Sequence, residues 1–318
     1  MATLAACAQH APQDTLKPAG PSARTIDNLM LPVFVVAGVI FLLVEGMVVL
    51  FVLRYRHRPG REDPVQIHGN TKLEIGWTLA PALILALVAV PTVFTIFKLA
   101  RKPPRALEVT VIGHQFWWEY HYKDMGIVSA NELHLPVGRP VELELRGADV
   151  IHSFWIPRLG GKTDVVPGRR NHMSVRADRP GTYLGQCTEF CGLSHANMRL
   201  RAIAQRPADF DAWAAGQRQP AATPPPDSPA AAGLTVFNQR GCAGCHTIEG
   251  VSKGMVGPNL THVHSRTTFA GSTFAMSPEN LRTWLRDPPA AKPGSKMPNL
   301  HLQPADITKL IDYLETLN

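Results

Sequence analysis

The sequence contains little of what marks several classes of protein. Only five of its 318 residues are cysteine, and four of these form two close pairs, whereas a disulfide framework joins residues that are distant in sequence. The 32 basic residues exceed the 25 acidic ones by only seven, and this excess lies mainly in the first third of the chain, where it flanks apolar runs. This argues against a nucleic-acid-binding face. A hydrophobic content of 45% argues against intrinsic disorder for most of the chain.

Two long apolar runs lie in the first third of the sequence. Residues 31–53 contain one charge, Glu45, and residues 75–97 contain none. Because a hydrocarbon core of about 30 Å needs about 20 apolar residues, each run is predicted to span a membrane as a helix. Glu45 is interpreted as a hydrogen-bonded glutamate facing a neighbouring helix, with a proton relay as the alternative. Four arginines within residues 54–61 favour a cytoplasmic connection, although basic residues after the second run oppose this orientation.

Short alternating segments between residues 107 and 205 predict an antiparallel β-sandwich or barrel. A group of metal donors follows near its end, in the pattern Cys-x₃-Cys-x₃-His-x₂-Met, and a further histidine comes from a separate loop. Soft thiolate, imidazole and thioether donors select copper, whereas a zinc site would be closed by four Cys or His ligands without the methionine. The alternative is a buried cysteine pair beside an incidental His and Met. The candidate donors are His152, Cys187, Cys191, His195 and Met198.

This motif resembles the dinuclear copper (CuA) site of subunit II of haem–copper cytochrome c oxidases, and the resemblance extends over roughly residues 30–205. Matching segments are 73–81, 113–120, 149–153 and 161–169. The resemblance implies two N-terminal helices followed by a cupredoxin domain. It also implies that two cysteines bridge the coppers, with the remaining ligands being two histidines, a methionine and one backbone carbonyl. The residues concerned are Cys187, Cys191, His152, His195, Met198 and the carbonyl of Glu189.

Further roles follow from the same resemblance. The Glu189 side chain is similar to the one that binds magnesium at the interface with subunit I. Glu74 aligns with a glutamate at the cytoplasmic mouth of a proton path, and its alternative is a solvated acid at a helix N-terminus. The family often has Trp after Gly-His-Gln, where electrons from a soluble cytochrome c arrive. This chain has Phe116 there, followed by Trp117 and Trp118, so Phe116 and Trp117 are the candidates for the electron path and the route of a soluble donor is expected to differ.

Residues 219–232 are rich in proline and alanine and predict a semi-rigid linker. In fully extended form it would reach about 40 Å. The run Cys242-Ala-Gly-Cys245-His246 follows, which is the signature of covalent c-type haem attachment with the histidine as the proximal ligand. A thioredoxin-like redox pair is the alternative for an isolated Cys-x-x-Cys.

The sequence after residue 246 resembles a small class I cytochrome c, over about residues 233–318. Met297, in a loop bounded by prolines, is the candidate for the sixth iron ligand, because a thioether suits a low-spin His/Met haem of raised potential. Pro258 resembles the family proline whose carbonyl fixes the proximal histidine ring. The rival axial ligands are Met255, Met276, His262 and His264.

We therefore expect a multidomain membrane protein with a two-helix transmembrane hairpin, an all-β cupredoxin domain and an all-α cytochrome c domain. The expected boundaries are 1–29 for an N-terminal extracytoplasmic segment, 30–105 for the hairpin, 106–218 for the copper domain, 219–232 for the linker and 233–318 for the cytochrome domain. Covalent haem attachment belongs to the extracytoplasmic side, which places both termini and both cofactor domains outside a bacterial plasma membrane. Cys7 lies in a sequence similar to a lipoprotein lipidation box, with chance as the alternative.

The expected function is that of the subunit through which electrons enter a caa-type terminal oxidase, from haem c to dinuclear copper and on to haem in subunit I. Oxygen reduction and proton pumping belong to that partner. The expected cofactors are CuA, covalent haem c and magnesium at the subunit I interface. The expected partners are subunit I, other oxidase subunits and an upstream donor, a cytochrome or a quinol:cytochrome c reductase. The alternatives are a membrane-tethered copper-binding or assembly protein with an accessory haem, and a quinol-oxidase subunit II, which lacks the copper ligands.

Overall fold

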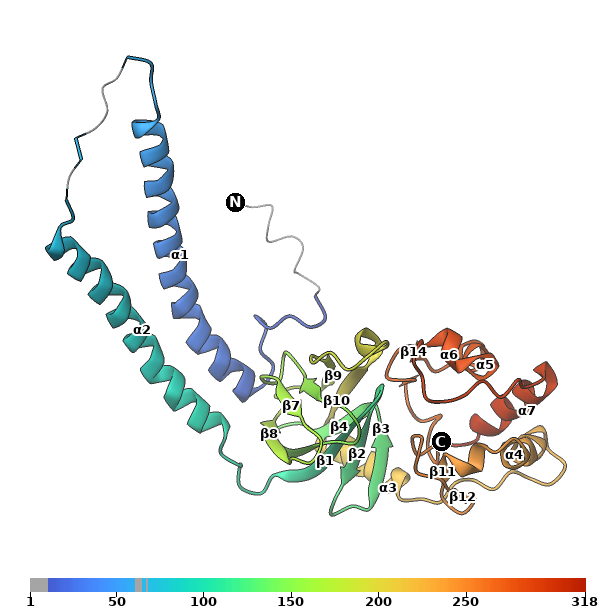
Figure 1. Ribbon diagram of the computed structural model, residues 1–318. Coiled ribbons are helices and arrows are strands. Elements are labelled where there is room, and N and C mark those ends of the chain that lie inside the picture. Colours follow the sequence, from blue (N-terminus) through green and yellow to red (C-terminus); the bar gives the residue numbers. More distant parts are fainter. Residues whose placement is uncertain (1–10, 61–64, 67) are drawn as a thin grey trace. The chain divides into compact units, whose positions relative to one another are not determined.

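The computed structural model describes residues 11–60, 65–66 and 68–318 (Figure 1). The chain divides into two compact units, which are treated separately below. One unit is Thr25–Arg101, and the other combines Lys102–Asn318 with the residues that precede Thr25. Cys7 lies outside the described residues, so its lipidation stays a prediction.

The first unit contains two long apolar helices, α1 (Pro21–Tyr55) and α2 (Thr71–Leu99). At 1.5 Å per residue, helices of 35 and 29 residues exceed a hydrocarbon core of about 30 Å. The apolar stretches of both contain no buried residue, as expected for surfaces that face lipid. The Asn70 side chain accepts hydrogen bonds from the backbone N–H groups of Lys72 and Leu73 and caps α2. The prediction of a helical hairpin that anchors the chain in a membrane is confirmed.

The second unit begins with a sandwich of two five-stranded sheets, in the orders β3-β2-β1-β5-β8 and β4-β10-β9-β6-β7. The β1–β5 and β4–β10 pairs are parallel, so the expectation of a purely antiparallel sandwich was wrong in this respect. The strands are β1 (Leu107–His114), β2 (Trp117–Tyr122), β3 (Ile127–Ala130), β4 (Glu132–Pro136), β5 (Val141–Gly147), β6 (His152–Trp155), β7 (Thr163–Val165), β8 (Asn171–Val175), β9 (Gly181–Cys187) and β10 (Arg199–Gln205).

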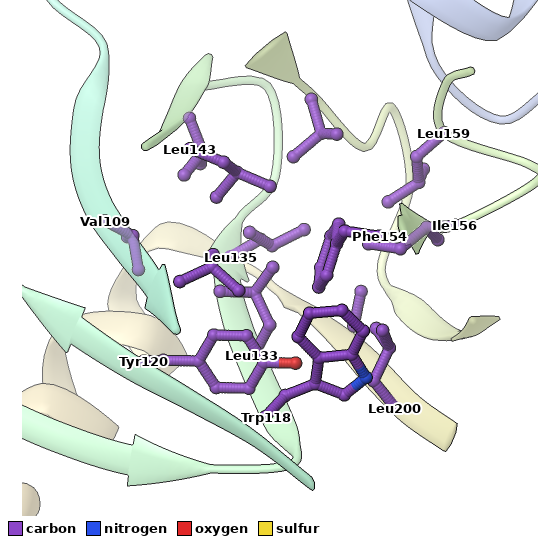
Figure 2. Close-up of a cluster of buried hydrophobic side chains, with 14 of the residues drawn as sticks. Val109, Trp118, Tyr120, Leu133, Leu135, Leu143, Phe154, Ile156, Leu159 and Leu200 are labelled. Carbon is purple, nitrogen blue, oxygen red and sulfur yellow. The ribbon is translucent and has the colours of Figure 1, made fainter. Parts of the chain in front are cut away.

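The core of the sandwich arises from the period-two alternation that the sequence predicts. On β2 every second side chain is buried, and Trp118 packs edge-on against Phe154 of β6 with ring centroids 5.0 Å apart. Figure 2 shows these two rings with Tyr120, Leu133 and Leu135 in the same cluster. This packing anchors β2 and β6, the strands that lie next to the predicted copper ligands.

One helix within this domain departs from the all-β expectation. Helix α3 (Pro207–Gln217) follows β10, and its Trp213 ring stacks on His134 at a centroid distance of 4.1 Å. Phe210 and Ala214 of the same helix are buried. These three residues have the i, i+3, i+4 spacing of an amphipathic helix, so the pattern was readable in the sequence.

The C-terminal part is a small helical domain. Its helices are α4 (Pro229–Gln239), α5 (Pro278–Arg286), α6 (Pro288–Ala291) and α7 (Pro304–Leu314), with the two-stranded pairs β11 (Thr247–Ile248) with β12 (Ser252–Lys253) and β13 (Thr268–Phe269) with β14 (Phe274–Ala275). Helices α4 and α7 pack closely because Gly233 has no Cβ, which would lie 2.0 Å from the Lys309 carbonyl oxygen. The helical expectation is confirmed, with the two short β pairs added.

The predicted linker, 219–232, differs from an extended spacer. Helix α4 begins at Pro229 and is capped by the Ser228 hydroxyl, so the last four residues of the predicted linker form its first turn. Ala221 packs against the core of the helical domain, and the Gln219 carbonyl oxygen lies 3.1 Å from Nε2 of His262. The boundaries of the linker and the domains stay predictions.

Candidate copper centre and haem site

The candidate copper ligands lie at the ends of β9 and β6 and in the loop between β9 and β10. Cys187 is the last residue of β9, and Met198 directly precedes β10. Between them, His195–Asn197 form a 3₁₀ turn, η1. His152 begins β6, whose register places Phe154 opposite Cys187. The sandwich therefore brings a distant histidine to the cysteine loop.

The structure brings all six predicted copper donors together. The two sulfur atoms of Cys187 and Cys191 lie 3.9 Å apart. Cys187 Sγ is 3.9 Å from His152 Nδ1 and 3.2 Å from the Glu189 carbonyl oxygen. Cys191 Sγ is 3.6 Å from His195 Nδ1 and 3.8 Å from Met198 Sδ. Each sulfur thus has its own histidine and one further donor, and this donor set would hold a pair of soft metal ions.

Burial and hydrogen bonding prepare these donors for metal binding. His152 and Met198 are completely buried, and the cysteines are 3% and 4% exposed. The hydrogen bond between the two thiols lowers the pKa of Cys187, while the same contact and burial raise the pKa of Cys191. Because cysteine binds a metal as the thiolate, metal binding displaces the thiol protons. The soft, buried donor set fits copper.

A neighbouring carboxylate sets the orientation of His152. Asp149 Oδ1 lies 2.8 Å from His152 Nε2, which leaves Nδ1 directed at Cys187. Such a contact fixes the tautomer and ring orientation of a ligating histidine. Gly113 also packs closely against the His152 ring, because a Cβ on Gly113 would lie 2.9 Å from it.

The two acidic residues expected to act outside the copper shell are exposed. Glu189 is exposed, although its carbonyl oxygen lies within the donor cluster. Glu74 lies in the first turn of α2, where an acid also interacts favourably with the helix dipole. Their magnesium and proton-path roles stay predictions.

The second candidate site lies in the helical domain. Cys242–Gly244 form a short 3₁₀ turn, η2, and His246 follows it. His246 Nδ1 lies 2.9 Å from the Pro258 carbonyl oxygen, so the ring donates there and its Nε2 is available to a metal. Burial lowers the pKa of His246, which favours the neutral ring that binds iron. Gly257 permits this packing, because its Cβ would lie 2.5 Å from the His246 ring.

A mainly apolar cavity contains His246 and Met297 in its lining, together with Cys245, Leu281 and Trp284. A pocket with an imidazole, a thioether and an attachment cysteine fits a covalently bound haem with His/Met ligation.

The rival axial ligands have other environments. Met255 is 84% exposed, and Met276 packs in the domain core. Both ring nitrogens of His262 are engaged by the backbone carbonyls of Asn318 and Gln219, and His264 Nδ1 lies 2.9 Å from the Asn318 side chain. Among the five candidates, only Met297 lines the cavity with His246; its role as axial ligand stays a prediction.

Sequence reasoning missed one residue of this cavity. Arg266 is 6% exposed and lines the cavity, and its Nη2 donates to the Asn259 carbonyl oxygen at 2.6 Å. Its Nε is buried and has no hydrogen-bond partner in the described part of the chain. A buried guanidinium with a spare donor suits a carboxylate, such as a haem propionate. In the sequence, Arg266 could be noticed only as an arginine eight residues after Pro258, which does not by itself indicate a buried cavity residue.

Replacing Met297 with leucine should leave the haem covalently attached but lower its reduction potential and open the sixth coordination position. Attachment depends on Cys242 and Cys245, whereas an axial methionine raises the potential. Redox titration and binding of cyanide or carbon monoxide measure the two effects. Met255→Leu is the matched control and should change neither. An unchanged potential with no ligand binding in the Met297 variant would assign the sixth position to another residue.

Phe116 and Trp117, whose role in an electron path stays a prediction, lie beside the candidate haem site. Both line the cavity that contains His246 and Met297, although they belong to the β-sandwich domain. The side chain of the preceding residue, Gln115, donates to the Cys191 carbonyl oxygen at 2.6 Å. Phe116 is only 5% exposed, so the face where a soluble donor was considered is covered by the helical domain.

Comparisons with known proteins follow the same division. Residues 8–95 match the family described as cytochrome c oxidase subunit II, transmembrane domain. Residues 127–204 match cytochrome c oxidase subunit II, periplasmic domain, and residues 230–318 match cytochrome c.

Two similar curated proteins cover nearly the whole chain, and a third covers part of it. Cytochrome c oxidase subunit 2 of Alkalihalophilus pseudofirmus is 39% identical, over 95% of this chain and 90% of that protein. The protein of the same name from Bacillus sp. PS3 is 35% identical, over 95% of this chain and 91% of that protein. Quinol oxidase subunit 2 of Bacillus cereus is 30% identical, over 62% of this chain and 70% of that protein.

Proposed function

The chain belongs to the cytochrome c oxidase subunit II family, and on this premise we propose that it is the subunit through which electrons enter a caa-type terminal oxidase. It has an electron-transfer role within an oxidoreductase complex and carries its own cytochrome c domain. In the proposed path, electrons pass from an upstream respiratory donor to haem c, then to dinuclear copper, and then to haem in subunit I.

One observation carries this proposal. The cavity that contains His246 and Met297 is also lined by Gln115, Phe116 and Trp117. Gln115 in turn contacts the backbone of Cys191. The rate of electron transfer falls steeply with distance. Residues that line the haem cavity and also contact the copper loop therefore favour direct transfer between the two sites.

Separate sets of residues would hold the two cofactors. The copper pair and the haem, when bound, supply the one-electron carriers. Cys187 and Cys191 would bridge the coppers, with His152, His195, Met198 and the Glu189 carbonyl completing the shells; Cys242, Cys245, His246 and Met297 would hold the haem. Both assigned shells are fully occupied by protein ligands, which leaves no position for oxygen and assigns oxygen reduction to subunit I.

The surface beside the copper loop suits a large protein partner. Val150, Ile151, Phe190 and Leu193 are 38%, 47%, 78% and 82% exposed. Neighbouring exposed apolar side chains of this size are typical of a protein interface. We assign this surface to subunit I and the exposed Glu189 side chain to a magnesium ion at that interface.

The orientation follows from the haem. The two helices anchor the chain in a membrane, which we take to be a bacterial plasma membrane. Covalent c-type attachment occurs on the extracytoplasmic side, so both cofactor domains and both termini are placed there. Glu74, in the first turn of α2, then lies at the cytoplasmic side, where a proton path begins.

Metal analysis with a reduced-minus-oxidised optical spectrum of the purified protein tests this function. We expect two coppers for each haem iron, with copper that resists chelators. A single exchangeable copper would support the alternative, a copper-binding or assembly protein with an accessory haem. A quinol-oxidase subunit II would bind no copper, and this alternative conflicts with the complete donor set of the chain.

A further inference from the structure

The segment that precedes the predicted axial methionine contacts the copper domain at several points. We call residues 292–297 the haem loop. Lys292 Nζ donates to the Phe116 carbonyl oxygen at 2.7 Å. The Ser194 hydroxyl donates to the Pro293 carbonyl oxygen at 2.5 Å. Lys296 Nζ lies 2.9 Å from Asp149 Oδ2. The haem loop thus contacts three segments near the copper ligands, those that contain Phe116, Asp149 and Ser194.

Lys292 is an unusual component of this contact, because its side chain is buried. It is 3% exposed, and its Nζ donates to the carbonyl oxygens of Phe116 and Ala270, each at 2.7 Å. A buried amine or ammonium is tolerated only where its N–H groups are hydrogen-bonded. The two hydrogen bonds therefore favour the position of the haem loop that keeps Lys292 against Phe116.

Two glycines with left-handed backbones allow the close approach. A Cβ on Gly271, whose φ is +72°, would lie 2.6 Å from the Phe116 carbonyl oxygen. A Cβ on Gly294, whose φ is +80°, would lie 3.1 Å from both Leu193 and the Phe116 ring. A side chain at Gly271 would collide with the Phe116 carbonyl, and one at Gly294 would crowd Leu193 and the Phe116 ring.

A second group of hydrogen bonds reinforces the same interface. Glu132 of β4 is completely buried. Its Oε1 accepts from the backbone N–H groups of Thr267 and Thr268, each at 2.9 Å, and from their hydroxyls at 2.5 and 3.1 Å. Interfaces between linked domains generally permit relative motion unless they are extensive. Here the haem-loop contacts and the Glu132 contacts both oppose relative motion of the two domains.

Asp149 joins the haem loop to a copper ligand. Its Oδ1 is 2.8 Å from His152 Nε2, while its Oδ2 is 2.8 Å from the Gln115 N–H and 2.9 Å from Lys296 Nζ. Burial alone would raise the pKa of Asp149, but these hydrogen bonds lower it. A carboxylate that also binds an ammonium is a weaker acceptor for the His152 ring, and such outer contacts tune a metal ligand.

We propose that the haem loop is a clasp that fixes the haem domain on the copper domain, and that Lys296, acting through Asp149, couples this docking to the copper ligand His152. The proposal rests on the function proposed above and deepens it. Lys296 is a positioning residue, since it reaches the copper site only through Asp149.

Proton NMR of the oxidised, copper-loaded full chain tests the coupling. With Nδ1 on copper, His152 carries an exchangeable proton on Nε2, whose resonance reports the hydrogen bond to Asp149. We expect Lys296→Met to shift this resonance and to lower the copper reduction potential, because Asp149 then accepts more strongly. Lys296→Arg should restore both. Lys309→Met, which removes an exposed charge from α7 of the same domain, is the matched control and should change neither. An unchanged His152 resonance in Lys296→Met would overturn the coupling.

Cleavage of the connection tests the clasp without any cofactor signal. A protease site inserted between Pro226 and Asp227, both exposed, allows the full chain to be cut after folding. We expect the two fragments to stay together during gel filtration at moderate salt, and Lys292→Met with Lys296→Met to separate them. Separation of the unmodified fragments at low salt would overturn the clasp. A chain without two coppers would instead contradict the proposed function, and the fragment assay would still report on docking.

Discussion

Replacing Cys187 or Cys191 with serine should abolish the dinuclear copper centre and leave the haem spectrum unchanged. The two sulfur atoms lie 3.9 Å apart, and each is the neighbour of one histidine. A harder serine oxygen cannot replace a bridging thiolate between two soft ions. The haem ligands belong to a separate helical core, so their cavity should survive. Copper analysis and optical spectra of the purified variants measure both effects.

The reciprocal variant supplies the control for this result. Cys242→Ser removes a haem thioether but leaves the copper donors intact, so we expect two coppers to remain and the haem attachment to be impaired. Retention of two coppers and normal turnover in either copper-site variant would contradict the copper assignment.

Deleting residues 219–318 should sharply reduce oxidase turnover with the native donor. The deletion removes the haem and uncovers Phe116, which is 5% exposed in the full chain. A linked domain has an effective concentration typically near millimolar for a short connection, and the clasp would make the contact more permanent. Steady-state oxygen consumption with the native donor measures the loss. The copper spectrum of the truncated chain verifies that the β-sandwich has folded.

Soluble cytochrome c should rescue the truncated oxidase only in part, and the rescue should weaken with salt if exposed charges steer the association. Phe116→Trp should improve rescue in the truncated form more than it changes the intact chain, because the helical domain covers Phe116 in the latter. If the truncated oxidase with soluble cytochrome c works as well as the intact one, the attached haem is not the obligatory donor.

The candidate copper donors could be found in the sequence because most of them are close in the chain. Cys187 to Met198 span one loop, so their spacing alone indicates a shared metal. His152 is distant, and the pairing of β6 with β9 is what brings it within 3.9 Å of Cys187. Its inclusion among the candidate donors therefore rested on its residue type and on the resemblance, not on spacing.

The interface between the domains was not readable from the sequence. Lys292, Lys296 and Glu132 have no local pattern, and their partners lie 176, 147 and at least 135 residues away. The predicted linker gave a tether that could reach about 40 Å, whereas the structure places the two domains in contact. Such contacts depend on how two completed surfaces fit together, which spacing in one chain does not encode.

The central claim is that electrons pass within this chain from haem c to the copper pair. A single electron injected photochemically into haem c of the assembled oxidase, with the haem and copper absorption bands followed together, tests it most directly. We expect haem reoxidation to match copper reduction in one first-order phase whose rate is independent of protein concentration. Haem reoxidation without copper reduction, or at a rate proportional to protein concentration, would contradict the account.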